Sequence, residues 1–446
     1  MKHFRVWRAW AGMGLVGMAL AGSSFGGNVT NHITVDQTWT VAVADCVFSN
    51  LTVGVVAGRD SGIAATVDGS LFADLDYGVH LVNASAAIDG CVFTNIVNED
   101  VVLWESYVDN WWCRTAELTG NRFHGGGKAG YPVVMYAAGN FAAGGNTATG
   151  YGLTEAGVRV GGWVPKGWAA TWGSNDLGYV IVAGVTVDAD AASRGSLTIA
   201  DGSTVYTCHA KALRVWGDLT VAGTPGGGVR FTTGGTNTPT GYGLQFDNTY
   251  GVSDLQHCRF DFMARGISIA DAKTNTATVR AGGCVFSNLT ERAIQIHNSP
   301  GVATLAMSNS LVTACEGSLY AYNGGQVAFA GTDFLDSGPV YGASGSQVDF
   351  EDCNFHELDV YPESGFFPKS HTSLGGPGGG FTLRHCTVAG NRGCGIRVTE
   401  SGGRSWRTAS CGTTNSGRSG RISAAATRRG RRASRARIRR GCWWIA

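Results

Sequence analysis

One short pattern recurs along this chain and constrains its fold more than any other feature. The pattern is an apolar residue, any residue, an apolar residue, two turn-forming residues, Cys or a small residue, any residue and Phe. Its ten copies are centred on Cys46, Ser70, Cys91, Asn121, Cys258, Cys284, Ser310, Thr332, Cys353 and Cys386. Self-similarity at a period of about 20 to 50 residues is the signature of stacked structural repeats.

Each copy predicts two short strands joined at a sharp corner. Apolar residues at alternate positions indicate a strand with one buried face. The turn-forming residues bend the chain, and the second strand points Cys and Phe inward. A third short apolar segment follows about eight residues later, as in Gly266-Ile267-Ser268-Ile269. Three strands per repeat form one coil of a solenoid, which buries its inner face only by stacking on the next coil.

This pattern resembles the right-handed parallel β-helix of the pectin-lyase-like superfamily over roughly residues 30–400. The stretch 213–224 also looks like coils of bacterial surface β-helix proteins. We therefore expect an all-β, right-handed parallel β-helix of two stacked segments, 27–150 and 175–402, joined by a Trp-rich seam at 151–174. A β-sandwich is the competing fold, but it predicts hairpin turns every 8–12 residues and no constant Cys-x-Phe phase.

The composition agrees with a strand-rich solenoid. Glycine accounts for 68 of the 446 residues, and charged residues for 15%, against about 25% in average domains. Lys and Glu, which favour helices, are scarce. These values exclude a coiled coil, a helical bundle and an acidic disordered chain. The 43% of hydrophobic residues allow a sizeable core.

The first 26 residues have the features of a secretory signal peptide. Lys2, Arg5 and Arg8 precede a short apolar run, and Ala19-Leu20-Ala21 offers a small-x-small cleavage site. The run is shorter than the ~20 apolar residues that a membrane span needs. We expect a secreted or cell-surface protein of bacterial type with no membrane span.

The last part of the chain, 403–446, differs sharply from the rest. Twelve arginines lie there, and no acidic residue follows Glu400. Without these arginines the chain has 34 − 12 = 22 basic residues against 33 acidic ones, a net charge of about −11. Such a run can be a basic tail for nucleic acid or an anionic membrane. Out-of-frame translation of GC-rich DNA gives the same mixture, and the repeat stops near Val398. We favour a disordered or out-of-frame tail and expect no nucleic-acid partner.

Six of the twelve cysteines share one interior repeat position: Cys46, Cys91, Cys258, Cys284, Cys353 and Cys386. Ser or Thr fills that position in other coils. A stack of small buried side chains explains this without disulfides, because a buried free Cys behaves as a small hydrophobe. Secretion would permit disulfides, and a bond between Cys386 and Cys394 stays open. The disulfide state is therefore undecided from the sequence.

No cofactor or metal site is expected. The sequence has no Cys-x-x-Cys, and its one Cys-x-x-His, at Cys353 and His356, has no second pair to complete four ligands. Calcium is possible but unsupported, because Asp74 and Asp76 supply too few oxygens for a site of six to eight ligands.

The superfamily resemblance implies a site in a groove over one strand of each coil. The outward residues of that strand are His80, Ser268, Gln295, Tyr320, Tyr341 and Arg397. None is a carboxylate, whereas glycoside hydrolysis needs two. A polar and aromatic row suits binding better than catalysis, with tyrosine faces stacking on sugar rings.

A dense set of tryptophans is the second candidate site. It comprises Trp104, Trp111, Trp112, Trp163, Trp168 and Trp172. The set can be a small core at the seam or a sugar-stacking platform. Adjacent strand residues point to opposite faces, so one of Trp111 and Trp112 can be exposed.

These features predict a binding or structural role, with glycan binding or adhesion as the leading hypothesis. The expected partner is a polysaccharide or cell-surface glycan. The alternative is a polysaccharide lyase or hydrolase acting in a groove over the β-helix. The sequence fixes neither the ligand nor the oligomeric state.

Overall fold

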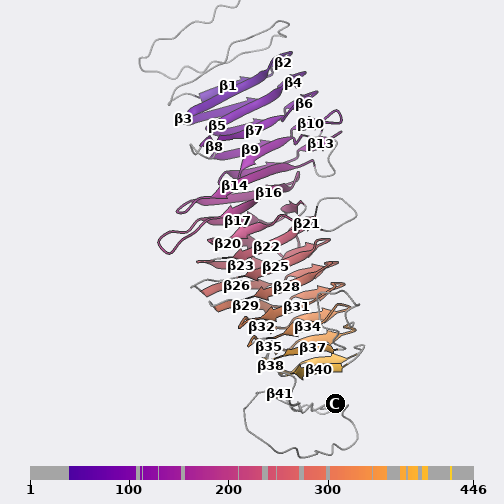
Figure 1. The fold of residues 1–446 in the computed structure, drawn as a ribbon. Helices are drawn as coiled ribbons and strands as arrows, with labels where there is room; N and C mark the ends of the chain where they lie inside the picture. Colours follow the sequence, from indigo (N-terminus) through magenta and orange to yellow (C-terminus); the bar gives the residue numbers. More distant parts are fainter. Residues whose placement is uncertain are drawn as a thin grey trace, which may run out of the picture.

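The chain is a parallel β-solenoid. Its computed structural model describes residues 40–106, 111–112, 114–128, 130–151, 156–208, 210–233, 240–247, 249–270, 276–297, 302–343, 345–358, 372–377, 380–389, 394–399 and 422–423. These residues form strands and turns and contain no helix (Figure 1). The predicted all-β fold is confirmed, and the β-sandwich is wrong, because neighbouring coils pair in parallel.

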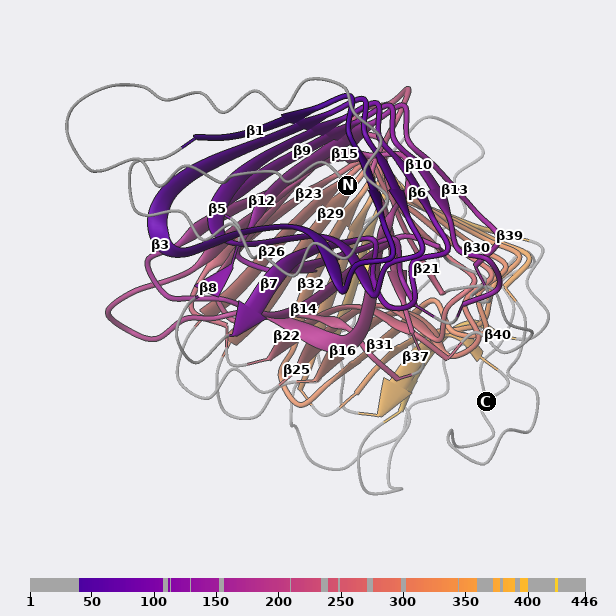
Figure 2. The ribbon, with the colours of Figure 1, turned by 90° about the horizontal axis from the view of Figure 1, so that it is seen from above.

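Each coil passes through three faces, which a view down the long axis separates (Figure 2). We call them faces C, A and B in the order in which the chain visits them. The long strands β3 and β5 turn the corner from face C to face A, so that their first halves belong to face C and their second halves to face A.

Face A contains the apolar-x-apolar strand of each repeat. Its strands, in pairing order, are β1 (Thr40–Ala44), β3 (Val53–Asp68), β5 (Tyr77–Asp89), β9 (Thr115–Thr119), β12 (Asn140–Gly144), β15 (Ala169–Asn175), β17 (Ser196–Ala200), β20 (Asp218–Ala222), β23 (Val252–Gln256), β26 (Thr276–Gly282), β29 (Val302–Ser308), β32 (Gln326–Ala330), β35 (Gln347–Glu351) and β38 (Gly380–Arg384). The short β41 (Ile422–Ser423) pairs antiparallel with β38.

Face B carries the Cys-x-Phe strand. Its strands are β2 (Val47–Ser49), β4 (Leu71–Ala73), β6 (Val92–Thr94), β10 (Arg122–His124) and β13 (Thr147–Thr149), and then β18 (Thr204–Thr207), β21 (Val229–Thr233), β24 (Cys258–Asp261), β27 (Val285–Ser287), β30 (Leu311–Thr313), β33 (Asp333–Leu335), β36 (Asn354–His356) and β39 (Thr387–Ala389). The first five form a separate sheet that ends at β13.

Face C holds the third strand of each coil. After the first halves of β3 and β5 come β7 (Val101–Ser106), β11 (Val133–Tyr136), β14 (Val158–Val164), β16 (Tyr179–Val187), β19 (Leu213–Val215), β22 (Tyr242–Asp247), β25 (Arg265–Ala270), β28 (Arg292–His297), β31 (Leu319–Tyr322), β34 (Val340–Gly342), β37 (Thr372–Pro377) and β40 (Cys394–Thr399). The short β8 (Trp111–Trp112) pairs antiparallel with β7.

The sheets branch in the middle of the solenoid. The first part of β16 pairs with β18 on face B, and its last part pairs with β19 on face C. Face C of the N-terminal coils therefore leads into two faces of the C-terminal coils. Residues 151–174, expected as an irregular seam, contain β14 and most of β15. The division of the chain into two segments stays a prediction.

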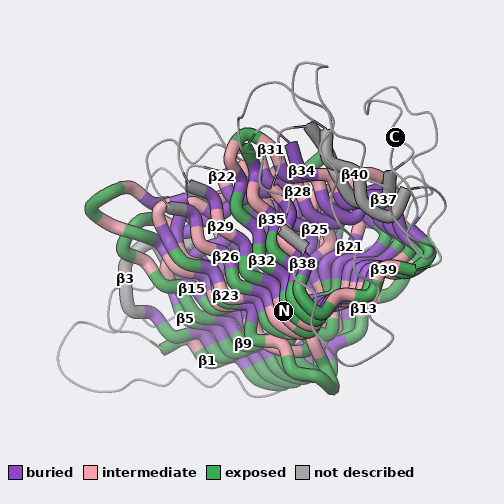
Figure 3. The backbone as a smooth tube through the Cα atoms, turned by 90° about the horizontal axis from the view of Figure 1, so that it is seen from below, coloured by how far each residue is buried: buried purple, intermediate pink, exposed green. Residues whose placement is uncertain are grey.

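The core fills the space between the three faces, and buried and exposed residues alternate along the strands (Figure 3). Phenylalanines of successive face B strands stack on one another inside it. The rings of Phe72 and Phe93 lie 4.8 Å apart, as do those of Phe260 and Phe286. This spacing equals the separation of about 4.8 Å between paired strands, so in-register aromatic residues stack without adjustment.

The corner between faces A and B uses one left-handed residue per coil. Gly90, with a φ of 58°, precedes the buried Cys91. The amide of Cys91 donates to Oδ1 of Asn121 on the next coil (2.9 Å), and the amide of Asn121 donates to Oδ1 of Asn146 on the coil after that (3.0 Å). A ladder of side-chain acceptors thus satisfies backbone amides that would otherwise be buried without partners.

The described cysteines are free thiols, in agreement with a stack of small side chains. Burial raises the pKa of Cys91 to about 11 and that of Cys315 to about 12, so both thiols stay protonated. Cys386 is only half-buried. The side chain of Cys394 lies outside the description, so its pairing with Cys386 stays open.

Candidate functional site

The structure aligns four of the six predicted outward residues on face C. Ser268, Gln295, Tyr320 and Tyr341 are successive partners in the registers of β25, β28, β31 and β34. Ser268 is 9% exposed, and the other three are half-buried. Neighbouring residues complete a polar and aromatic surface that we call the face C strip, defined as Arg292, Gln295, His297, Tyr320, Tyr322 and Tyr341.

Tyr320 is held between two neighbours. The Arg292 guanidinium carbon lies 4.3 Å from the centroid of its ring. The ring of Tyr341 stacks on it at 5.0 Å, with 8° between the planes. Because Arg292 and Tyr341 belong to the preceding and the following coil, they cover opposite faces of Tyr320. Both faces of the Tyr320 ring are therefore in contact with side chains of this protein.

Tyr341 differs from Tyr320 in what lies next to its second ring face. Its register partner on the following strand is Gly375, which has no side chain. The ring face of Tyr341 turned away from Tyr320 thus lies over a position without a side chain. Burial, and then the neighbouring Tyr320, raises the pKa of Tyr341. Its phenol therefore keeps its proton at neutral pH and can donate a hydrogen bond.

The rest of the strip is ordered by contacts within it. Nη1 of Arg292 donates to Oε1 of Gln295 at 2.7 Å. Tyr322 makes an edge contact with Tyr320 at 4.9 Å, and its ring centroid lies 4.1 Å from that of His297. Burial raises the pKa of Tyr322 as well. The strip thus combines rigid aromatic rings with several hydrogen-bonding groups.

Two carboxylates at the edge of the strip were missed by reasoning from the sequence. Glu291 and Glu316 occupy the turns that lead from face B into β28 and β31. Glu291 forms an ion pair with Arg265 (2.5 Å), whose guanidinium also lies over the ring of Tyr242. Burial, and then Glu291, raises the pKa of Glu316. Both residues lie outside the strands, so the alternation of side chains along a strand does not indicate them.

The other predicted site residues lie elsewhere. His80 pairs with Val102, and its row runs along β11, β14 and the first part of β16 to Tyr206 on face B. It therefore belongs to a different row from Tyr320. Arg397 is two coils beyond Tyr341 in the same row, and its side chain lies outside the description. The same holds for the side chains of Trp111 and Trp112.

The described tryptophans are mostly packed. Trp172 is fully buried and donates from Nε1 to the carbonyl of Ala137 (3.0 Å), and Trp168 donates to that of Ala138 (2.8 Å). Trp163, at 39% exposure, meets the buried ring of Tyr136 edge-on. At Trp172 the core interpretation is confirmed, and Trp163 is the exposed member of the described part.

No set of three or more His, Cys, Asp or Glu side chains that could hold a metal ion occurs among the described residues. Asp74, which we considered for calcium, has a φ of 55° and accepts a hydrogen bond from Asn95. Asp74 is therefore a turn residue whose side chain bonds to the turn of the next coil. Within the same described part, no helix is long and apolar enough to cross a membrane.

Comparison with known proteins supports the fold. Residues 242–408 match the family model for a right-handed β-helix region. This part of the chain is thus similar to right-handed β-helix proteins. The match and the parallel coils agree with the resemblance to the pectin-lyase-like superfamily. No curated protein and no solved structure matches the chain.

Proposed function

We propose that this protein is an exported glycan-binding protein that holds a polysaccharide or cell-surface glycan on the face C strip. The observation that carries the proposal is the position of Tyr341. One ring face packs on Tyr320, and the other lies over Gly375. A sugar ring can stack on that second face while groups of the strip bond its hydroxyls.

The contacts within the strip favour binding because they fix its side chains before a ligand arrives. Arg292 contacts both Tyr320 and Gln295. Side chains already held in one conformation lose little entropy on binding, which raises affinity. Aromatic residues with a polar tip provide apolar contact and hydrogen bonds together. Export rests on the signal-like residues 1–26, and adhesion to glycan-coated surfaces is the role we favour.

The binding test uses the full chain and immobilised neutral and acidic polysaccharides. We expect retention on at least one of them, weakened about tenfold or more by Tyr341→Ala, which corresponds to about 1.4 kcal/mol. Tyr341→Phe should keep most of the affinity because it keeps the ring. Gly375→Val should weaken binding by covering the ring face. Tyr206→Ala, on face B, is the matched control and should bind as the unaltered protein does.

A second candidate function is polysaccharide hydrolysis, favoured by Glu291 and Glu316. A carboxyl group with a raised pKa, such as Glu316, is suited to donate a proton to a leaving oxygen, with a second carboxylate as its partner. Release of soluble oligosaccharides by the full chain, abolished by Glu316→Gln, would establish this activity. Retention without release would support binding alone.

A further inference from the structure

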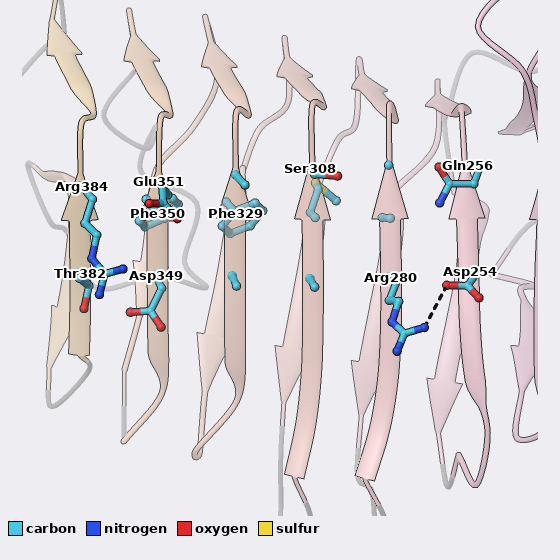
Figure 4. A pocket seen from close by; sticks show the side chains of 16 residues that line it. Asp254, Gln256, Arg280, Ser308, Phe329, Asp349, Phe350, Glu351, Thr382 and Arg384 are labelled. Carbon is cyan, nitrogen blue, oxygen red and sulfur yellow. Dashed lines mark ion pairs between the residues drawn. The ribbon is translucent and has the colours of Figure 1, made fainter.

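A hollow of about 470 Å³ lies on the outer side of face A, over the strands from β23 to β38 (Figure 4). We call it the face A trough. Its floor consists of the short side chains of Ala306 and Ser308 on β29 and of Ala328 and Ala330 on β32. Longer side chains stand on either side, with Arg280 on β26 and with Asp349 and Glu351 on β35. Its volume lies within the range of about 300–1,000 Å³ typical of ligand sites.

The backbone beneath the trough has no free edge. β29 pairs with β26 and β32, and β32 pairs with β29 and β35. An extended peptide therefore cannot add to these strands through its main chain. A ligand in the trough has to be recognised by side chains. The hydroxyl groups of Ser308 and Thr382 and the amide of Gln256, which all line the trough, suit the hydroxyl groups of a sugar.

The acidic side chains on the two sides of the trough differ in whether they form ion pairs. On one side, Asp254 and Arg280 form an ion pair at 3.9 Å. On the other side, Asp349 and Glu351 are two residues apart on β35, so their side chains point to the same side of the sheet. Asp349 accepts a hydrogen bond from Nε2 of Gln347 (2.7 Å). In the described part of the chain, neither carboxylate forms an ion pair with a basic side chain.

Arg384 on β38 is the register partner of Glu351 and also lines the trough. The lining therefore carries three carboxylates and two guanidinium groups. Two of the carboxylates lie together beside a floor without long side chains. A polyanion placed on that floor would meet their repulsion, whereas a cationic group would form charge-assisted hydrogen bonds with them.

We propose that the face A trough is a second binding site, for a glycan that carries protonated amino groups. One amino group lies between Asp349 and Glu351, and the apolar face of a sugar ring rests on the methyl groups of Ala328 and Ala330. Ring hydroxyls bond Ser308 and the groups beside it. Because the trough lies on face A, this site is independent of the glycan site proposed on face C.

The test measures binding of the full chain to three probes by titration calorimetry. The probes are a deacetylated glucosamine oligomer, its fully acetylated counterpart and polylysine. We expect binding of the deacetylated oligomer and no detectable binding of the acetylated one. Asp349→Asn with Glu351→Gln should weaken binding by tenfold or more, because the charge-assisted hydrogen bonds to the amino group are lost. Added salt should weaken it too.

The matched control removes two carboxylates from the same sheet, far from the trough. Asp89→Asn with Glu117→Gln on β5 and β9 should leave the affinity unchanged. Equal binding of both sugar oligomers, or equal affinity in the Asp349/Glu351 variant, would overturn the proposal. Binding of polylysine without binding of the sugar would overturn the assignment to a glycan. Unchanged thermal unfolding of the variant verifies that its fold is intact.

Discussion

The rings of Tyr320 and Tyr341 stack at 5.0 Å with an angle of 8° between their planes. Parallel coils place in-register residues about 4.8 Å apart, so stacking follows from the register itself. The stack uses one face of each ring, and Arg292 covers the second face of Tyr320. The second face of Tyr341 lies over Gly375, and it is the face on which the proposed glycan would stack.

Arg292 should act as a positioning residue for the face C strip. Arg292→Met removes its contact with the Tyr320 ring and its hydrogen bond to Gln295. A cation–π contact contributes about 0.5–2 kcal/mol, so we expect glycan affinity to fall several-fold while the protein stays folded. Binding titration and thermal unfolding separate the two effects. Arg122→Met, at an exposed site on face B, is the control, and equal affinities of both variants would contradict the role.

The side-chain ladder at the corner between faces A and B should carry a large part of local stability. Asn121→Ala leaves the amide of Cys91 and the carbonyl of Ile88 without partners. Each buried unpaired group costs about 1–3 kcal/mol, so the free energy of unfolding should fall by about 2–6 kcal/mol in denaturant titrations. Asn121→Ser should cost less, since Ser70 and Ser310 accept the equivalent amide in other coils. Equal losses would contradict the ladder.

Replacing Phe262 should make the protein more stable. It has a φ of 52° and is 52% exposed. The equivalent corner position holds Asn95 and Asn288 in other coils, also with positive φ. Left-handed backbone costs most residues about 1–2 kcal/mol, and Asn tolerates it. Phe262→Asn should therefore raise the free energy of unfolding by about 1 kcal/mol, and Asn288→Phe should lower it. A loss of stability in Phe262→Asn would contradict this assignment.

Asp100 should make stability depend on pH. It is fully buried, accepts hydrogen bonds from Lys128 Nζ (2.7 Å) and the hydroxyl of Tyr151, and has its pKa raised by burial from 3.8 to about 6. Between these values the folded protein binds more protons than the unfolded chain, so stability falls as pH rises from about 4 to about 6. The full change is about 3 kcal/mol at about 1.4 kcal/mol per pKa unit.

The measurement compares denaturant unfolding of the unaltered protein and of Asp100→Asn at pH 4 and pH 7. Asparagine does not titrate, so the variant should lack this loss of stability, whatever its absolute stability at either pH. Asp190 provides a control of opposite sign, because Lys166 and the turn amides lower its pKa to about 2. The contribution of Asp190 to the free energy of unfolding should therefore be lost as the pH falls toward 2. An unchanged pH dependence in Asp100→Asn would contradict the role of burial.

The sequence was sufficient for the coil and for much of the strip. The constant phase of Cys-x-Phe follows from the corner geometry, so the register of Ser268, Gln295, Tyr320 and Tyr341 could be predicted from alternation alone. The place of His80 could not, because the branch of β16 onto faces B and C depends on pairing between coils distant in the chain.

Contacts between coils account for the features of the two sites that the sequence does not predict. Arg292 is three positions before Gln295, and nothing local indicates that its guanidinium covers Tyr320 on the next coil. The face A trough arises where short residues on two coils meet long ones on their neighbours. It lies on face A, whereas the outward residues predicted from the sequence belong to the third strand of each coil.

The most direct test of the central claim is retention of the full chain on immobilised polysaccharides, with analysis of the soluble fraction for released oligosaccharides. The account predicts that the unaltered protein is retained on at least one polysaccharide, that Tyr341→Ala is retained about tenfold less, and that no oligosaccharides are released. Equal retention of both proteins, or the absence of retention on every polysaccharide tested, would contradict binding through the face C strip.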